Sequence, residues 1–403
     1  MRTVLFVGAG RHQRRAIEHA RGRGLRVVAV DRNAEAPGLA SADVAEVVDF
    51  TDVPAVTEVG RRHRIDGVLT VSADRAVPVV AAVADALGLP GIGIDTAHRM
   101  THKLEMRAAL ADARVPQPPF AAIRSAEDAA RALEVSGLPA VLKPVDSGGQ
   151  RAVFRVDGAD DLERDLGDAL LESPTHEAMV EAFVDGIEMN GIVIARGGGV
   201  SLLTLSDRLR PPGIGFGVGW MHVYPPSISA DQLQRAEHIA VDSVRALGLR
   251  DGIAFPQLIA APDGRVLVVE VAARIPGGQM ADLVRHAVGV DLVEIALTQA
   301  LGEAVPDELA LPRFSQPLAI RFFTAEPGPL PTGRVVSIGS LQPVLASAGV
   351  VQADTYLEVG ETIRPVRRDG DRRGYVIAIG DAPNEAVRRA DQAAALLTVE
   401  VAT

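Results

Sequence analysis

Two lysines mark the part of the sequence that is best suited to bind a phosphate group. Lys103 and Lys143 are the only lysines among 41 lysine and arginine residues, so arginine supplies every other such charge. Lys143 ends an apolar run in "VLKPVDSGGQ", and a turn with two glycines follows at residues 147–150. Glycines let backbone N–H groups approach a phosphate, and lysine adds a compact charge that the wide guanidinium fork does not reproduce. A solvated surface lysine is the open alternative, but two lysines at two such places favour phosphate binding.

A second group of candidate residues lies in the predicted hairpin "FPQLIAAPDGRVLVVEV", which turns at Asp263 and Gly264. A tight turn there places Gln257 and Glu270 roughly opposite each other on the two strands. Mg²⁺ bound to nucleotide phosphates takes a few oxygen ligands and keeps its waters. An acid inside the apolar run "VLVVEVAA" is unfavourable unless it binds something. We therefore predict Glu270 as a metal ligand and Gln257 as a neutral oxygen ligand at best; an ordinary hairpin glutamate is the alternative.

A long Gly- and Pro-rich loop at residues 206–226 holds the candidates for a substrate site. Loops of about twenty residues in compact proteins are often functional lids. An arginine would bind a carboxylate, and a tryptophan would form a wall of a side-chain pocket. The candidate substrate residues in this loop are Arg208, Arg210, Trp220 and His222. An ordinary long loop is the alternative.

A weaker motif follows the first predicted strand. "VGAGRHQRRA" offers Gly8 and Gly10 of a dinucleotide-binding fingerprint, but Gln13 stands where the third glycine belongs. Asp31, at the end of the second predicted strand, is where a ribose-binding acid would sit. We favour a glycine turn that joins strand to helix, or a helix N-terminus that holds a small ligand, over a nicotinamide dehydrogenase.

The elements that must position these residues form three regions. Residues 1–100 alternate strands and helices, which predicts a parallel sheet with helices on both faces, a doubly wound domain. Residues 101–310 mix helices with antiparallel hairpins, and residues 311–403 form a smaller α+β piece with Pro-rich joints. The predicted fold class is therefore α/β and α+β.

Composition excludes several classes of function. The 403 residues carry a formal net charge of −11, which gives no general attraction for nucleic acid or an anionic membrane. No apolar run reaches about 18 residues, so no membrane span is expected. The chain has no cysteine, which excludes disulfides, thiolate metal sites and cysteine nucleophiles. A cytoplasmic protein that acts on small molecules is the expectation.

Four stretches together resemble the ATP-grasp superfamily, in the expected order and with suitable spacing. They are "HKLEMRAALADARVPQPPF", "LPAVLKPVDSGGQRAV", "MVEAFVDGIEMN" and "LVVEVAARIPGG". The resemblance covers residues 1–310, and the C-terminal piece is similar to the closing domain of the L-amino acid ligase-like and biotin carboxylase-like branches. It implies a pre-ATP-grasp domain at 1–100, an ATP-grasp domain at 101–310 and a closing domain at 311–403. Residues 101–185 would then hold the glycine loop and adenine hinge, and residues 186–310 the metal, phosphate and acceptor side.

The resemblance implies roles for individual residues. The lysines would contact ATP phosphates, the glycine turn would fold over them, the backbone of Glu181 and Val184 would bind the adenine edge, and Glu188 would take the ribose hydroxyls. Arg274 would stabilise the transferred phosphoryl group, and Gly277 and Gly278 would present N–H groups to a substrate carboxylate. The residues so assigned to ATP are Lys103, Lys143, Ser147, Gly148, Gly149, Gln150, Glu181, Phe183, Val184 and Glu188, and those assigned to catalysis are Lys143 and Arg274.

Two positions depart from the family pattern. Gln257 stands where the family usually has an acid, and Ala272 where it often has asparagine. Either one Mg²⁺ (or Mn²⁺) ion is held more weakly, or an acid from elsewhere compensates.

The resemblance implies an ADP-forming ligase that activates a small carboxylate as an acyl phosphate and joins it to an amine. A carboxylase that activates bicarbonate, and a nucleotide-binding protein without turnover, are the alternatives. A homodimer is possible, because dimers are common in such families.

Overall fold

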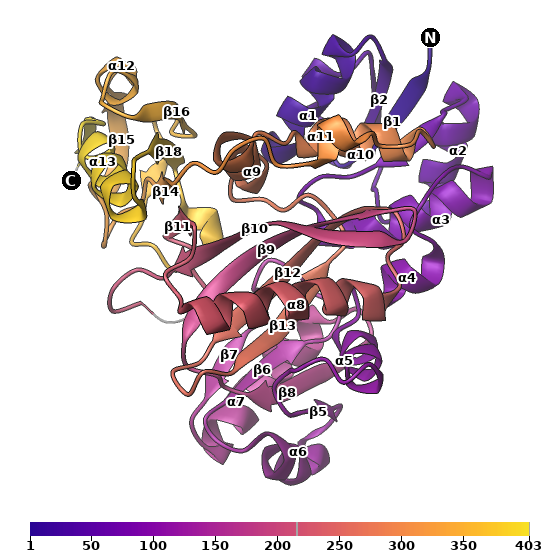
Figure 1. Cartoon of the computed structure of the whole chain (residues 1–403), viewed down its shortest axis with the longest axis vertical. Helices are drawn as coiled ribbons and strands as arrows, with labels where there is room; N and C mark the ends of the chain where they lie inside the picture. The colour runs from indigo at the N-terminus through magenta and orange to yellow at the C-terminus, as the bar shows by residue number, and fades with distance from the viewer. Residues whose placement is uncertain (215–216, 403) are drawn as a thin grey trace.

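The computed structural model describes residues 1–214 and 217–402 (Figure 1). Its N-terminal part is a parallel four-stranded sheet of order β3-β2-β1-β4. The strands are β1 (Thr3–Val7), β2 (Arg26–Asp31), β3 (Val44–Val47) and β4 (Gly67–Leu69). The helices of this part are α1 (Arg11–Gly22), α2 (Val53–His63), α3 (Val77–Leu87) and α4 (Ile94–Arg99).

Alternation of apolar residues along β1 explains the two covered faces of this sheet. Val4 and Phe6 belong to the hydrophobic cluster that includes α1, whereas Leu5 and Val7 belong to the cluster that includes α2 and α3. Successive strand residues point to opposite faces, so a run without polar residues requires cover on both. The predicted doubly wound sheet is confirmed.

A second, antiparallel sheet of order β5-β8-β6-β7 follows. Its strands are β5 (Phe120–Ile123), β6 (Ala140–Pro144), β7 (Phe154–Val156) and β8 (Ala178–Ala182), and the nearby helices are α5 (Lys103–Asp112), α6 (Ala129–Ser136) and α7 (Ala159–Glu172). The predicted hairpin around the glycine turn is present, because β6 pairs with β7 in antiparallel register. Its second strand is shorter than expected and begins only at Phe154.

An eight-stranded sheet forms the centre of the molecule, in the order β13-β12-β9-β10-β11-β14-β18-β16. Its strands are β9 (Ile187–Arg196), β10 (Gly199–Leu209), β11 (Met221–Tyr224), β12 (Gly252–Ala260), β13 (Val266–Ala272), β14 (Leu318–Phe322), β16 (Val350–Thr355) and β18 (Gly374–Ile379). Helix α8 (Ala230–Leu247) crosses the part of this sheet that contains β12 and β13 (Figure 1). The sheet continues past residue 310, so the division into 1–100, 101–310 and 311–403 stays a prediction.

The segment after the hairpin returns to the N-terminal part of the chain. Helix α10 (Leu292–Ala300) packs against both α1 and β4, helix α11 (Asp307–Ala310) packs on α10, and helix α9 (Met280–Val288) packs on β10 and β14. This return brings residues near 275 to the end of β4, where Ser72 N–H donates to the Ile275 carbonyl (2.9 Å). The fold thereby joins two regions that are 200 residues apart in the sequence.

The C-terminal part adds a three-stranded sheet of order β17-β15-β19. Its elements are β15 (Gly333–Ile338), β17 (Thr362–Ile363), β19 (Val399–Ala402), α12 (Gln342–Leu345) and α13 (Pro383–Ala394). Helix α13 packs on β14 and β18 of the large sheet. In residues 1–214 and 217–402, no helix combines the length and apolar character needed to cross a membrane.

Candidate active site

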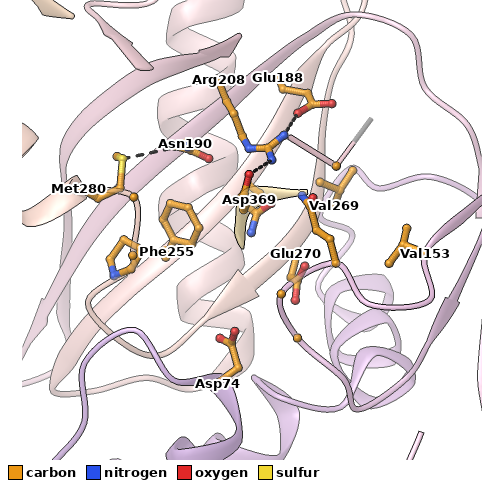
Figure 2. Close-up of a pocket in the computed structure, with 18 of the residues that line it drawn as sticks. Asp74, Val153, Glu188, Asn190, Arg208, Phe255, Val269, Glu270, Met280 and Asp369 are labelled. Atoms are coloured by element: carbon orange, nitrogen blue, oxygen red, sulfur yellow. Dashed lines mark hydrogen bonds and ion pairs between the residues drawn. The ribbon is translucent and has the colours of Figure 1, made fainter. Parts of the chain in front are cut away.

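A cavity of about 530 Å³ (Figure 2) is lined by residues of the antiparallel sheet β5-β8-β6-β7, of the eight-stranded sheet and of the N-terminal part of the chain. We call one side of it the lysine end, defined by Lys103, Lys143, Glu181, Glu270 and Arg274. The other side, the arginine end, is defined by Arg208, His222, Asp369 and Arg372. All nine residues line the cavity. The predicted phosphate and metal residues therefore share one cavity with predicted substrate residues.

The two lysines meet because helix α5 begins at the end of β6. Lys103 N–H donates to the Val145 carbonyl (2.7 Å), and Lys103 Nζ donates to the Ser147 carbonyl (2.7 Å) at the start of the glycine turn. Lys103 Nζ also lies 3.9 Å from Glu270 Oε1. These contacts hold the Lys103 ammonium group between the glycine turn and Glu270.

Lys143 is buried and paired with the Glu181 carboxylate (Nζ to Oε1, 2.5 Å). Arg107, also buried, binds the other oxygen of Glu181. Burial alone would raise the pKa of Glu181, but Arg107 and Lys143 lower it. Burial also lowers the pKa of Lys143, against the pull of Glu181. The side chain of Glu181 therefore fixes Lys143, and only its backbone is left for the predicted adenine contact.

The glycine turn carries the backbone strain that glycine relieves. Gly149 has φ +71°, and Gln150 has φ +58°. With its amide oriented to satisfy its hydrogen bonds, Gln150 donates to the Gly217 carbonyl and accepts from Arg208 Nη2 (3.0 Å). Ser147 Oγ donates to Glu172 (2.8 Å). The turn thus contacts the arginine end of the cavity as well as the lysine end.

Glu188, the predicted ribose ligand, is held by two arginines. Its carboxylate lies 2.6 Å from Arg208 Nη1 and 3.2 Å from Arg210 Nε; Figure 2 shows the pair with Arg208. Glu188, Phe183 and Val184 line the cavity, whereas Arg210 does not. An arginine-bound carboxylate can still accept from hydroxyls through its remaining lone pairs.

The predicted register of the hairpin is confirmed. Gln257 of β12 pairs directly with Glu270 of β13, and a bulge follows at Leu258. No group of three or more histidine, aspartate or glutamate side chains in the described residues is arranged to hold a metal ion. One carboxylate and one amide oxygen nevertheless fit an ion that takes most of its ligands from nucleotide phosphates and water.

Arg274 lies at the lysine end in a two-bond pair with Asp74. Its Nε and Nη2 atoms donate to Asp74 Oδ1 (2.6 Å) and Oδ2 (2.9 Å). Its third nitrogen, Nη1, is buried and has no partner within the described part of the chain. The pair with Asp74 therefore fixes the guanidinium plane and leaves the Nη1 amino group as the unpartnered end among the described residues.

The arginine end surrounds one carboxylate with two cations. Asp369 is ion-paired with Arg372, lies 3.8 Å from Arg208, and accepts from Gly219 N–H (2.8 Å). The Arg372 guanidinium lies over the Phe322 ring, 4.2 Å from its centroid. Arg11, from the start of α1, lines the same cavity and stacks on Tyr356 (4.6 Å). Cations exceed anions here, which suits an anionic group of a ligand.

His222 is neutral in this cationic surrounding. It is not in a loop, as the sequence suggested, because β11 pairs it with Ile320 and Arg208 on neighbouring strands. Burial, followed by Arg372 and Arg208, lowers its pKa to about 3. Its Nδ1 atom lies 3.3 Å from Asn190 Nδ2. At neutral pH the imidazole is therefore a hydrogen-bonding group and not a cation.

The predicted loop at 206–226 is shorter than expected, because residues 206–209 end β10 and residues 221–224 form β11. Gly215 and Phe216 lie outside the described residues. Trp220 does not line the cavity. It packs in the C-terminal hydrophobic cluster, with Arg321 over its ring at 3.8 Å. Of the four candidates in this loop, the fold therefore brings Arg208 and His222 to the cavity.

The two glycines after Arg274 also line the cavity. Gly278 has φ +65°, and a Cβ atom there would lie 3.2 Å from His222 Nε2. Gly277 faces Ser72. A side chain at 278 would therefore crowd the arginine end.

The structure does not support a dinucleotide site at the first glycine turn, because Asp31 is not free to bind a ribose. Asp31 accepts from Ala9 N–H (2.9 Å) and from Asn33 N–H (2.9 Å), so both carboxylate oxygens serve the local loop. Gln13 donates to the Val71 carbonyl. Gly8 and Gly10 do not line the cavity, which agrees with the turn that we favour.

Sequence reasoning missed four cavity or support residues. They are Asp74, Arg107, Asp369 and Arg372. Arg107 carried a signal, because it is one helical turn after Lys103 and so shares its face. Asp74 and Asp369 each begin a short 3-10 turn, Arg372 follows the second of these turns, and nothing in their local sequence points to the cavity.

The comparisons with known proteins agree with this architecture. The model of the carbamoyl-phosphate synthase L chain ATP-binding domain matches residues 101–308. The ATP-grasp N-terminal domain matches residues 17–91, and the L-amino acid ligase C-terminal domain 2 matches residues 321–402. The fold and these matches define the class as ATP-grasp, ADP-forming ligases.

The chain belongs to the family of the carbamoyl-phosphate synthase L chain ATP-binding domain. It is 28% identical over 407 residues to the formate-dependent phosphoribosylglycinamide formyltransferase of Synechococcus sp. (strain CC9605), covering 99% of this chain and 97% of that protein. The L-amino acid ligase structure from Bacillus licheniformis superposes with a TM-score of 0.84 at 22% identity, covering 100% of this chain and 99% of that one. The structure of phosphoribosylglycinamide synthetase from Anaerococcus prevotii superposes with a TM-score of 0.79 at 18% identity, covering 100% of both chains.

Proposed function

We propose that the protein uses ATP to activate a small carboxylate as an acyl phosphate and joins it to the amine of an amino acid or similar molecule, releasing ADP and phosphate. The observation that carries this proposal is the lysine end, where two lysines, Glu270 and Arg274 line one cavity. In a ligase of this type a carboxylate oxygen attacks the γ-phosphorus, and the bond to the β–γ bridging oxygen breaks. The amine then attacks the acyl carbon, loses a proton and expels phosphate.

The residues would divide the work by position. Lys103 and Lys143 would hold the phosphates, with Ser147, Gly148, Gly149 and Gln150 closing over them. Arg274 Nη1 would donate to the phosphoryl oxygens where negative charge spreads in the transition state. Glu181, Phe183, Val184 and Glu188 would hold adenine and ribose.

Glu270, with the Gln257 amide oxygen, would hold Mg²⁺ or Mn²⁺, which supplies charge neutralisation on the phosphates when bound. The Gln257–Glu270 register supports this assignment, since it points two oxygen-bearing side chains from adjacent strands toward one place. A single carboxylate suits an ion that arrives with the nucleotide.

The arginine end would bind the acid or amino acid substrate. Arg208 and Arg372 line the cavity there, and Gly277 and Gly278 provide room for a carboxylate beside His222. The match of residues 321–402 to the L-amino acid ligase C-terminal domain 2 supports an amino acid as one substrate.

The test is ATP-dependent phosphate release with a panel of acids and amines, read together with the mass of the product. Phosphate release that requires one acid and one amine, with a product of their combined mass less water, supports the proposal. Release with bicarbonate alone would favour a carboxylase. ATP binding without release under any pair of substrates would mean a nucleotide-binding protein without turnover.

A second candidate has a specific observation in its favour. The formate-dependent phosphoribosylglycinamide formyltransferase aligns with 99% of this chain, and the arginine end would accept a phosphate as readily as a carboxylate. Under this alternative the acid is formate and the amine carries a phosphoribosyl group. Formate and phosphoribosylglycinamide therefore belong in the panel beside the amino acids.

The assembly state is a further prediction. One neighbour of the same fold, the biotin carboxylase domain of Hydrogenobacter thermophilus 2-oxoglutarate carboxylase, was solved as a dimer. We expect a homodimer, which light scattering of the purified protein will show or refute.

A further inference from the structure

Asp74 joins the N-terminal part of the chain to the lysine end. It begins a single 3-10 turn (Asp74–Ala76) soon after β4, and its carboxylate pairs with Arg274, 200 residues later in the chain. Both oxygens of Asp74 accept from Arg274, at 2.6 and 2.9 Å. A two-bond pair fixes the plane of a guanidinium as well as its place. Arg274 Nη1, the nitrogen left over, therefore has a defined direction in the cavity.

The backbone holds this pair in register. Val71 forms a parallel bridge with Ile275, and Ser72 N–H donates to the Ile275 carbonyl (2.9 Å). These contacts lie three and two residues before Asp74 and one residue after Arg274. The two partners thus stand on segments that are tied together beside them, so the pair is part of the folded frame.

Asp74 also lies against the glycine turn. A Cβ atom built on Gly148 would be 2.7 Å from Asp74 Oδ2 and 3.0 Å from Asp74 Cβ. Gly149 differs, because it has φ +71° and open space around it. Gly148 is therefore required by the Asp74 carboxylate, whereas Gly149 is required by the backbone.

Asp74 cannot act as a proton acceptor in this arrangement. Burial by itself would raise its pKa, but Arg274 lowers it, and Lys103 adds to this effect. A general base needs a pKa near the working pH and a free lone pair toward the proton. Both oxygens of Asp74 already face Arg274, so a supporting role fits the geometry better than a chemical one.

We propose that Asp74 is a positioning residue with two partners: it orients Arg274 and forms the surface on which Gly148 of the turn rests. The arrival of the turn over the nucleotide is then coupled to the alignment of Arg274. This inference rests on the proposed function for the role of Arg274 in phosphoryl transfer, but the contact between Asp74 and Gly148 does not depend on that function.

The main test is a rescue. Gly148→Ala adds a methyl group against a carboxylate that Arg274 pins in place, so we expect kcat to fall on the order of tenfold, as when one residue of a coupled pair is disturbed. In the Asp74→Gly background the carboxylate and the Cβ atom are both absent, so the methyl group has room. Adding Gly148→Ala there should change kcat by less than about twofold, the scatter of additive mutations.

Gly149→Ala is the matched control, because its penalty comes from a positive φ and not from Asp74. It should impair the enzyme equally in both backgrounds. If Gly148→Ala also has the same effect in both backgrounds, Gly148 does not rest on Asp74 and the inference is overturned.

Asp74→Asn separates orientation from folding. It keeps the shape of the side chain but loses the second acceptor and the charge, so Arg274 is held by one bond. We expect kcat to fall about tenfold while KM for ATP stays within about twofold, since an interaction made mainly in the transition state is lost. An unchanged kcat, or a rise in KM alone, would contradict the positioning role.

A readout without turnover keeps the two proposals apart. The thermal midpoints of wild type, Gly148→Ala, Asp74→Gly and the double variant form a cycle. Gly148→Ala should lower the midpoint by on the order of 2 °C in the wild-type background and leave it unchanged beside Asp74→Gly. If this pattern holds and no acid and amine support phosphate release, only the proposed function fails. If release occurs and the pattern is absent, only the Asp74 inference fails.

Discussion

The lysine end and the arginine end of the cavity are built in different ways. At the lysine end, four cations face three carboxylates, and each carboxylate has its own partners: Glu181 pairs with Lys143 and Arg107, Asp74 with Arg274, and Glu270 lies near Lys103. At the arginine end, Arg208 is shared between Glu188 and Asp369, Arg210 and Arg372 each bind one of them, and Arg11 on Tyr356 adds a fourth cation to two carboxylates. The first, nearly matched network holds its members in place, whereas the larger surplus of the second attracts a ligand that supplies negative charge. The difference suggests a preformed nucleotide site beside a substrate site that is completed only by its anion.

The largest expected effect is at Lys143, in the matched network. Lys143→Ala removes the proposed phosphate contact and leaves Glu181 with one partner, so ATP affinity should fall by on the order of 100-fold or more, as for a truncated buried charge pair. Lys143→Arg should also be impaired, because the wider head does not fit between Glu181 and the cavity. Calorimetric titration with MgATP measures both.

Arg131→Ala, on the exposed surface of α6, is the control for Lys143 and should bind ATP normally. Circular dichroism and thermal unfolding will show whether the Lys143 variants are folded. Normal MgATP binding by a folded Lys143→Ala protein would remove the basis for the nucleotide site.

The next effect concerns acid stability at the arginine end. His222 has a pKa of about 3 in the folded protein, lowered by burial first and then by Arg372 and Arg208, against about 6.5 in an unfolded chain. Below pH 6.5 His222 binds a proton in the unfolded chain but stays neutral in the folded protein until the pH approaches 3. The free energy of unfolding should therefore fall as the pH drops from 6.5 toward 3, by about 2 kcal/mol at pH 5 from this residue.

Urea unfolding at pH 7 and pH 5 of wild type and His222→Gln measures this effect. The variant has no titrating group at 222, so it should lose less stability between the two pH values, and neither protein should gain from His222 above pH 7. Equal losses would show that His222 is not buried as a neutral group. His286→Gln, in the same chain outside the cavity, is the control.

A smaller effect is expected when the arginine end loses one cation. Arg372→Ala should raise KM for the anionic substrate about tenfold, within the range for one truncated site residue, and leave KM for ATP unchanged. Steady-state kinetics with each substrate varied in turn gives both values. Arg368→Ala, exposed and on the same loop, should change neither, and a rise in KM for ATP alone would place the nucleotide at the arginine end.

The smallest effect tests the metal assignment at the hairpin. Gln257→Glu adds a second carboxylate beside Glu270, and a charge about 4 Å from a ligand position contributes about 1 kcal/mol in water, or about fivefold in affinity. The Mg²⁺ concentration at half-maximal activity should fall by this factor, and should rise in Glu270→Gln. Asp263→Asn, at the turn of the same hairpin, is the control. If neither change alters the Mg²⁺ dependence, Glu270 and Gln257 do not bind the metal.

Local sequence patterns predicted the parts that depend on neighbouring residues. The apolar runs and glycine turns gave the N-terminal strands, the hairpin after Lys143, and the pairing of Gln257 with Glu270. Counting from a turn at Asp263 and Gly264 gives the Gln257–Glu270 pair, but the pairs next to the turn are shifted by one residue, and a bulge between Gln257 and Leu258 restores the counted register. The resemblance to ATP-grasp proteins was confirmed as well, because its four stretches lie inside the matched family range or beside it.

Residues 206–226 show where prediction from local sequence failed. The Gly and Pro content of residues 206–226 predicted an open loop, but Met221–Tyr224 form a central strand between β10 and β14. Partners on β14 lie about 100 residues away, and their pairing overrides the local preference. Trp220 was predicted in the substrate pocket, but its ring packs on the C-terminal hydrophobic cluster and under Arg321. These contacts also come from segments distant in the sequence.

The sequence by itself determined that this protein has a lysine on a buried strand before a glycine turn, a hairpin acid paired with a neutral amide, and a parallel sheet before them. These features follow from residue type, spacing and strand periodicity. Only the tertiary structure decided that Asp74 holds Arg274, that Asp369 and Arg372 complete the cavity, and that His222 is a neutral strand residue. Each of these depends on contacts between segments about 100 to 200 residues apart, and the burial that sets their charge exists only once those segments have packed together.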